Sequence, residues 1–542
     1  MPNLGLTVRR RYRVLRGQPG IIQAIAAGSA LTLLIGMGTV GAHVLDSSSA
    51  DPQATGLNGG PGLPTGTTGP GGATPGTPGT PGVPGASTAP GSVPGQPGQP
   101  GQPGNPGDPV NPGDPGNPGD PGQPPFTGPL TASDVGVTAT TIKVVFTWYS
   151  VAEAAATVGG TVARVESSTE SINAYVNYVN KTGINGRKIL PQIEEINPLN
   201  ETDMAARCKR WADDDKVFAV VDGFGLWHSV HQLCVTADHH MPLLTNIGVT
   251  ETFMTQARPY LWWTAPSYEQ IVTHWTLWAR DKGQLSNAKI GVVISNKAEE
   301  LVALEAMVKM LERIGFDRDE LVVEPIPFDA AGAAAAIPGA VNRMKGAKVN
   351  RLFFMLPFTT AGPWVQTSEA QDFFPRYLLS DYQSNIVTAE AVFGSQYPKS
   401  FNGSEGVSHI RLVDPADVKK YTPFEARCNK IWQDANPELE AAWRGGIAMR
   451  WCQSILLFTE AGRRASPHLT RLGWAQAMST IRSYDAALTP SFSFGPGDFV
   501  GPTQMQGLRV YTDRAKCPNE TRSDDNGICY VTTEPFRPLR HL

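Results

Sequence analysis

Two closely spaced glycines raise the first chemical possibility in this sequence. In the segment VFAVVDGFGLWHSVHQLC (217–234), Gly223 and Gly225 follow an apolar run, as at a nucleotide-binding turn. That fingerprint requires a third glycine, and His228 stands in its place. The bulky pair Leu226–Trp227 would also keep a pyrophosphate away from the backbone. We therefore expect neither a nucleotide nor another cofactor at this turn.

The same segment carries residue types that bind metals. His228, His231 and Cys234 are spaced by three residues, which places them along one face of a helix, and zinc accepts nitrogen and sulfur ligands. Cys234 also has a natural partner in Cys208, and a sulfur in a disulfide is lost to the metal. We expect the disulfide and no metal.

A third interpretation is a pocket for the polar group of a small solute. In an open parallel sheet, ligands bind beyond the carboxyl ends of the strands. Ser229 stands where a helix would begin after such a strand, and its hydroxyl could cap the helix or meet a ligand. The backbone amides of a helix start attract anions. This interpretation fits the residues best.

Enzyme motifs are not found in the sequence. There is no nucleophile elbow, no H-E-x-x-H and no phosphate loop with lysine. The carboxylates at Glu194–Glu195 and Asp213–Asp215 fall at the ends of predicted elements, where we expect them to be solvated. We expect a binding protein and not an enzyme.

An apolar run near the amino end predicts that most of the chain lies outside the cytoplasm. Residues 21–45 form an uncharged apolar run long enough for a membrane helix. Residues 1–20 carry arginines, so the positive-inside rule leaves them in the cytoplasm and exports the rest of the chain. The alternative is a cleaved signal peptide. The net charge of −4 gives no reason to expect a nucleic-acid partner.

A linker rich in glycine and proline comes next, over residues 46–134. It has little to bury, so we expect it to be disordered and extended, as a spacer through a cell wall. Glycine recurs at every third position from Gly95 to Gly122, as in collagen, but Val110 occupies one glycine slot. A wall-spanning structural protein with a collagen-like stalk therefore stays the weaker alternative.

The folded part begins near residue 135 and alternates strands with helices. TIKVVFTW (141–148) is a β-branched apolar strand, and ESINAYVNYVNKTG (170–183) has the apolar spacing of a helix. The alternation continues, and it restarts after WWTAPS (262–267) as a second set. Repeated units of this kind predict an α/β fold with two mostly parallel sheets, each flanked by helices.

The order of these segments resembles the type I periplasmic binding proteins, the family of branched-chain amino-acid and amide receptors of ABC importers. The resemblance is carried by GVTATTIKVVF, INAYVNYVNKTGINGRKI, DDKVFAVVDGFG, HHMPLLTN, AKVNRLFFMLPF and SFSFGPGDFVGPTQMQGLRVY. It implies two lobes that close on a solute, a Venus-flytrap architecture. Lobe 1 would comprise residues 135–263 and 415–490, lobe 2 residues 264–414 and 491–512, and a tail 513–542.

The resemblance also implies which residues contact the solute. In the family, the loops at the matching positions hold the carboxylate and amine of an amino acid. Aromatic residues stand where smaller ones are common, which favours a larger, flatter or more apolar solute. Packing between loop and helix is the alternative for Trp148 and Trp227. The predicted contacts are Trp148, Tyr149, Trp227, His228, Ser229, Thr245, Asn246, Ser295, Phe358 and Asp381.

Six cysteines agree with export, because disulfides persist outside the cytoplasm. Fifteen connectivities are possible. Pairing of near neighbours predicts the disulfides Cys208–Cys234, Cys428–Cys452 and Cys517–Cys529.

Together these features predict a monomeric solute-binding protein on the outer side of the cell membrane, held by one transmembrane helix. Its solute would be amino-acid-like or a larger apolar or aromatic carboxylate, delivered to an ABC permease in the membrane. The alternative from another class is an extracellular sensor that signals through a partner protein, because soluble capture needs no permanent anchor.

Overall fold

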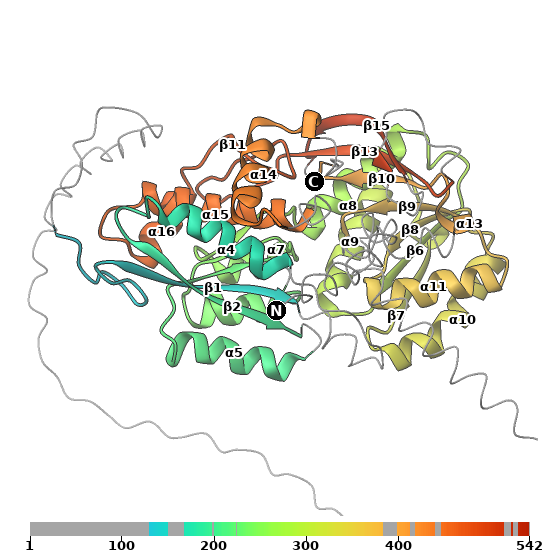
Figure 1. The fold of residues 1–542 in the computed structure, drawn as a ribbon. Coiled ribbons are helices and arrows are strands. Elements are labelled where there is room, and N and C mark those ends of the chain that lie inside the picture. The colour runs from blue at the N-terminus through green and yellow to red at the C-terminus, as the bar shows by residue number, and fades with distance from the viewer. Residues whose placement is uncertain are drawn as a thin grey trace, which may run out of the picture. The chain divides into compact units, whose positions relative to one another are not determined.

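The structure is a computed structural model, and it describes residues 129–149, 167–197, 200–223, 225–382, 398–411, 418–438, 446–513, 522–523 and 529–540 (Figure 1). The predicted membrane segment 21–45 and most of the predicted linker lie outside these residues. Among the residues that are described, no helix is both long enough and apolar enough to cross a membrane.

A five-stranded parallel sheet forms the first half of the fold, in the order β2-β1-β3-β4-β5. Its inner strands are buried on both faces, which explains why the sequence has apolar runs here and no strict alternation. The strands are β1 (Thr141–Tyr149), β2 (Lys188–Ile196), β3 (Ala219–Asp222), β4 (Leu243–Thr245) and β5 (Leu261–Trp263).

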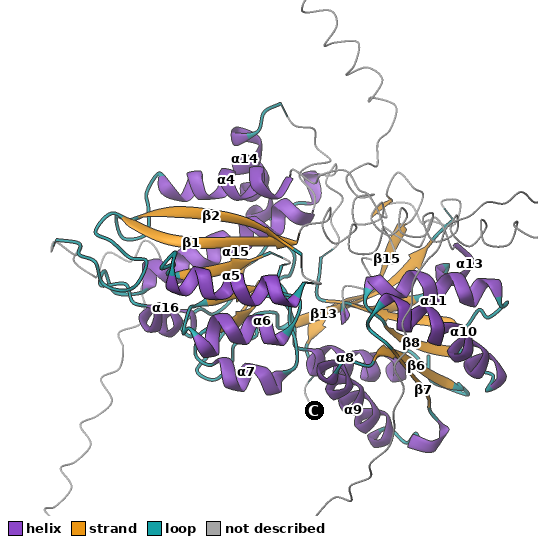
Figure 2. Ribbon diagram, turned by 90° about the horizontal axis from the view of Figure 1, so that it is seen from below, coloured by secondary structure: helices purple, strands orange, loops and turns teal. Residues whose placement is uncertain are grey.

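Helices cover both faces of this sheet, and they come from distant parts of the chain. Figure 2 shows α4 and α14 on one side of β1 and β2, with α5 and α6 on the other. In α4 the apolar residues Ile172, Tyr175, Val176 and Val179 all lie buried, as their helical spacing predicts. The elements around this sheet are α4 (Ser167–Asn180), α5 (Glu201–Asp213), α6 (Ser229–Leu233), the π-helix η1 (Cys234–Asp238), α7 (Glu251–Ala257), η5 (Val418–Lys420), α14 (Pro423–Ala435), α15 (Gly446–Arg464) and α16 (Arg471–Met478).

An eight-stranded sheet forms the second half, in the order β14-β15-β13-β10-β9-β8-β6-β7. Pairing is parallel from β7 through β10, and antiparallel where β13, β15 and β14 extend the sheet. The strands are β6 (Ile290–Ser295), β7 (Val322–Ile326), β8 (Arg351–Met355), β9 (Arg376–Ser380), β10 (Glu405–Ser408), β13 (Gln504–Tyr511), β14 (Arg522–Ser523) and β15 (Cys529–Pro538).

The two faces of this second sheet pack into separate cores. Val292 and Phe353 belong to the cluster that also holds residues of α8 and α9, whereas Val293 and Phe354 belong to the cluster with α10 and α11. Adjacent residues of a strand point to opposite faces, so each strand supplies both cores. The helices here are α8 (Tyr268–Asp281), α9 (Ala298–Arg313), the 3-10 turn η2 (Arg318–Glu320), α10 (Ala330–Gly346), α11 (Phe358–Ala370) and α13 (Pro398–Phe401). The predicted α/β class, with parallel sheets flanked by helices, is confirmed.

The chain passes between the two sheets at the predicted crossover. β5 ends at Trp263, and α8 of the second half begins after Ser267, whose hydroxyl caps the helix by accepting the Gln270 amide. A returning segment lies beside the crossover, because the Trp263 amide donates to the Phe499 carbonyl at 2.9 Å. A short ribbon of β11 (Tyr484–Asp485) and β12 (Ser491–Phe492) precedes that segment.

Residues beyond 512, predicted only as a tail, add strands to the second sheet. β15 pairs antiparallel with β13 over most of its length, and the pairing includes Tyr511 with Cys529. The tail therefore covers a position that would otherwise be an edge of the sheet at β13.

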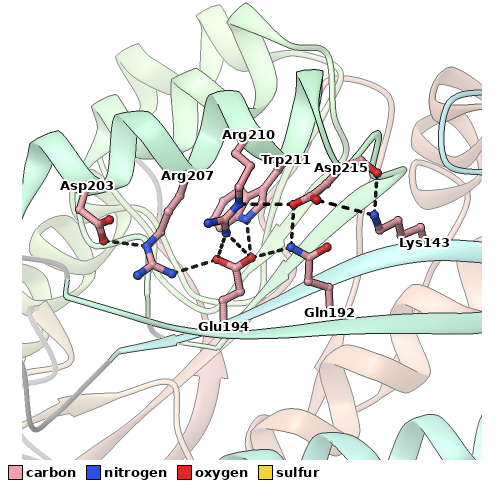
Figure 3. Close-up of polar contacts among 8 residues, drawn as sticks. All are labelled: Lys143, Gln192, Glu194, Asp203, Arg207, Arg210, Trp211 and Asp215. Carbon is pink, nitrogen blue, oxygen red and sulfur yellow. Dashed lines mark hydrogen bonds and ion pairs between the residues drawn. The ribbon is translucent and has the colours of Figure 1, made fainter.

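Carboxylates that we expected to be solvated instead hold β2 to α5. The Glu194 side chain is only 9% exposed and accepts hydrogen bonds from Arg207, Arg210 and Trp211 (Figure 3). Asp215 is 26% exposed and pairs with Arg210 and with Lys143 near the start of β1. The expectation was wrong for Glu194 because α5 packs its arginines onto the strand, a contact that neither element shows by itself.

Candidate functional site

The carboxyl ends of the parallel strands are where a solute is expected to bind. In the first sheet these ends include Tyr149, Asp222 and Thr245, and in the second they include Ser295 and Ser380. All ten predicted contact residues lie at the strand ends or in the segments directly after them. All ten therefore lie on the carboxyl-end side of their sheets.

Asp222 holds the strand ends of the first sheet together. One carboxylate oxygen accepts the Thr147 hydroxyl and the Gly225 amide, both at 2.6 Å, and the other accepts the Thr245 hydroxyl at 2.6 Å. Asp222 is fully buried, and desolvation raises its pKa although these hydrogen bonds act to lower it. Sequence reasoning missed this residue, whose signal was an acid at the end of the apolar run before Gly223.

Thr245, a predicted solute contact, uses its hydroxyl within this arrangement. It is 1% exposed, and its oxygen also accepts the Ile247 amide at 3.1 Å. In the structure it supports the loop after β4.

A carboxylate from the second half already lies at Ser229. The Ser229 amide donates to Glu299 Oε2 at 3.2 Å, and the Ser229 hydroxyl donates to the same oxygen. His228 Nδ1 lies 3.3 Å from Glu299 Oε1. The anion that the sequence led us to expect at Ser229 is thus present, but as the side chain of Glu299 at the start of α9.

Further charged and polar groups surround this contact. The Lys297 ammonium lies 3.1 Å from His228 Nδ1 and 3.9 Å from the centre of the Phe328 ring. His231 is 4% exposed, its ring lies 5.3 Å from that of His228, and neither of its nitrogens has a hydrogen-bond partner among the described residues. Burial lowers the pKa of His231 to about 3, so its ring is neutral at physiological pH.

The pKa of Glu299 shows which effect dominates at this contact. Burial alone would raise it, but the hydrogen bonds from His228 and Ser229 outweigh burial, and the pKa lies below its usual value. The neighbouring Glu300 is 1% exposed, and burial together with the Glu299 charge raises its pKa to about 8. Of two adjacent glutamates, the first is therefore held ionised and the second favours its protonated form.

Aromatic rings gather beside this contact at the end of β1. The Tyr149 ring lies 4.9 Å from Trp148 and 5.7 Å from Trp227. Trp148 is 3% exposed and packs 6.4 Å from Trp451 of α15, so the packing alternative describes it well. Tyr149 and Trp227 are only half-buried, so each keeps part of its side chain at the surface.

Asn246 links the loops after β3 and β4 to α15. Its Nδ2 lies 3.4 Å from both the Gly223 carbonyl oxygen and the Ser454 hydroxyl, and its side-chain oxygen accepts the Thr264 hydroxyl. It is 6% exposed, so its role in the structure is to connect these loops.

Comparison with known proteins then decides the family. A family model described as "Periplasmic binding protein" matches residues 154–514, which is well over half of the chain. The chain belongs to the type I periplasmic binding proteins. None of the curated proteins compared with the chain matches it.

Solved structures share the fold of this periplasmic binding protein at low sequence identity. A solute-binding protein of an ABC transporter from R. palustris, in complex with 4-hydroxybenzoate, is 14% identical with a TM-score of 0.54, covering 74% of this chain and 98% of that one. A fatty acid ABC transporter substrate-binding protein from Thermomonospora curvata is 16% identical with a TM-score of 0.54, covering 75% and 95%. A leucine binding protein from Thermotoga maritima is 12% identical with a TM-score of 0.50, covering 69% and 95%.

In the second half of this periplasmic binding protein, Asp381 is surrounded by donors. Its Oδ1 accepts the Ser408 hydroxyl at 2.9 Å, its Oδ2 accepts the His409 amide, and His409 Nδ1 lies 2.6 Å from the same Oδ2. Ser295 is fully buried at the end of β6. Phe358 is the first residue of α11, and its side chain lies outside the described part.

Two of the three predicted disulfides are confirmed, Cys208–Cys234 and Cys428–Cys452. Cys529 is also disulfide-bonded, but its predicted partner Cys517 lies outside the described residues. Cys208, Cys234 and His239 are close enough to hold a metal ion, yet both sulfurs are oxidised. A disulfide sulfur is not the thiolate that zinc binds.

A cavity of about 310 Å³ lies elsewhere in the second half. Arg376 and Ser404 are among its lining residues, and they stand at the amino ends of β9 and β10. The contact of Ser229 with Glu299, by contrast, lies beyond the carboxyl ends of β3 and β6.

Proposed function

We propose that this protein is an extracellular, membrane-tethered solute-binding protein that captures a small organic solute between its two halves and delivers it to an ABC importer. The observation that carries the proposal is the contact of Glu299 with Ser229 and His228, which joins the strand ends of the two sheets. A protein whose halves meet at their strand ends can enclose a solute there.

Binding would then act as a population shift. A solute that touches both halves lowers the free energy of the closed state more than that of the open state. The chain connections between the sheets would serve as the hinge, and residues of β5 and the segment near Phe499 lie in it.

The aromatic group at the end of β1 indicates the kind of solute. Tyr149 and Trp227 supply a large apolar surface with polar tips, which suits a flat or apolar body better than a small amino-acid side chain. The similar structures named for 4-hydroxybenzoate and for fatty acids support an apolar or aromatic carboxylate as the solute. The leucine binding protein is the reason to test an amino acid as well.

The test uses the purified full chain in detergent, with 4-hydroxybenzoate, a medium-chain fatty acid and leucine as probes. One class should change the tryptophan fluorescence saturably and lower the radius of gyration in X-ray scattering. Trp227→Ala should weaken that binding about five- to thirtyfold, since aromatic contacts of this kind carry about 1–2 kcal/mol. The exposed Phe374→Ala is the matched control and should change nothing. A fluorescence change without compaction, or no response across these classes, would count against capture between two halves.

The tether is supported by the apolar run 21–45 and by the glycine- and proline-rich sequence after it. Cell fractionation should recover the protein with membranes, and protease added to intact cells should remove the folded part. A mature protein that begins after residue 45 on N-terminal sequencing would replace the anchor by a cleaved signal peptide.

A further inference from the structure

The Glu299 side chain occupies a small, built environment for one carboxylate. Its two oxygens face polar groups of the first half: the Ser229 amide and hydroxyl donate to Oε2, and His228 Nδ1 lies 3.3 Å from Oε1. All three residues are buried, with 8% exposure for Glu299, 6% for His228 and 2% for Ser229. A carboxylate enclosed in this way resembles a bound ligand carboxylate. It differs from a surface ion pair, which would contribute little to the free energy of folding.

The surroundings hold further polar groups beyond those that contact Glu299. The Lys297 ammonium lies 3.1 Å from the His228 ring. His231, whose ring packs against that of His228, is buried with both ring nitrogens unpartnered among the described residues.

The position also borders the surface that a solute can reach. Trp227 directly precedes His228 and stacks beside Tyr149. A solute resting on these rings would bring its polar end toward Ser229, where the Glu299 carboxylate already lies. A second carboxylate there would meet a like charge at close range and would compete for the same donors.

We propose that Glu299 is a specificity-determining residue, a resident carboxylate that excludes a solute carboxylate from Ser229 and His228. A carboxylate-bearing solute is then held with that group turned away from Ser229, and a neutral polar group is accepted near it. This inference rests on the proposed function and refines its solute class, but its test does not depend on knowing the natural solute.

The test removes the Glu299 carboxylate by mutation and measures whether a small carboxylate binds in its place. In the full chain, Glu299→Ala should bind acetate at least tenfold more tightly than acetamide, its neutral counterpart of the same shape, in calorimetry or in acetate-observed NMR. The wild-type chain should bind neither. Adding Ser229→Ala to Glu299→Ala should reduce the acetate preference, because the hydroxyl donor is gone while the Ser229 amide stays.

Two further arms keep the outcome decisive. Glu299→Gln fills the position without charge and should bind neither probe. If Glu299→Ala unfolds, acetate should restore stability by taking the place of the missing side chain. The thermal midpoint of the variant in sodium acetate should then be higher than its midpoint in the same concentration of acetamide, with sodium chloride added to match the ionic strength. Equal acetate binding by wild type and Glu299→Ala, or no preference of Glu299→Ala for acetate over acetamide, would overturn the proposal. Either result would leave capture of a solute between the halves standing.

Discussion

At the scale of single residues, the polar side chains around the site divide into those that hold the loops and those that face the other half. Asp222 and Asn246 belong to the first kind, because each connects segments of the first half. Ser229 and His228 belong to the second, because they contact Glu299. This division decides which substitutions alter stability and which alter binding.

Asp222→Ala should lower the free energy of unfolding by about 2–4 kcal/mol, since it leaves the Thr147 and Thr245 hydroxyls and two loop amides without an acceptor. Chemical denaturation monitored by circular dichroism measures it. Asp434→Ala is the matched control, because that aspartate is exposed and pairs with Lys430 on the surface of α14. The control should change the free energy by less than about 0.5 kcal/mol. Similar values for the two variants would contradict the role given to Asp222.

At the scale of elements, the contact between β2 and α5 depends on one buried carboxylate. Glu194 receives hydrogen bonds from the Gln192 amide, the Trp211 indole and two arginines (Figure 3). These bonds outweigh the burial that would raise its pKa, so its pKa lies below the usual value. The network therefore docks α5 onto the outer strand of the sheet.

Glu194→Gln should lower the free energy of unfolding by about 1–3 kcal/mol, because it removes the charge that both arginines share. Glu195→Gln, at the next position of β2, is the matched control, since its side chain takes no part in the network drawn in Figure 3. Urea denaturation of the two variants compares them directly. An equal loss in both would mean that strand propensity, and not the network, sets the stability of this edge.

At the scale of the whole molecule, buried histidines link stability to pH. Burial lowers the pKa of His231 to about 3 and that of His274 to about 4. In the unfolded chain both titrate near 6.5. Between about pH 6.5 and pH 4 the unfolded state therefore binds more protons than the folded state, and stability falls as the pH falls.

The expected slope is up to about 1.4 kcal/mol per pH unit for each histidine within that window. His274→Gln should flatten the dependence of the unfolding free energy on pH, measured between about pH 4.5 and 7 in denaturant titrations. The exposed His468→Gln serves as the control and should keep the wild-type slope. A slope unchanged by His274→Gln would contradict the assignment.

Much of the architecture was predictable from local pattern. The apolar spacing in α4, the buried runs of β1 and β3, and the pairing of cysteines 24 and 26 residues apart each depend on residues near one another in sequence. The family resemblance was also recognisable from sequence, because it depends on the order in which these local strand and helix patterns follow one another. The place of Ser229 at the helix start that follows a buried strand likewise indicated that it lies near the strand ends.

The partners of these residues were decided only by tertiary structure. Glu299 stands 70 residues after Ser229, and Thr147 stands 75 residues before Asp222, so neither contact leaves a local signal. A carboxylate in a sequence looks the same whether water or a distant arginine surrounds it, which is why the prediction for Glu194 was wrong. Sequence alone determined which segments form strands and helices, since periodicity is a property of neighbours along the chain. Packing of the two sheets determined which charges meet, and with them the chemistry that the strand ends present to a solute.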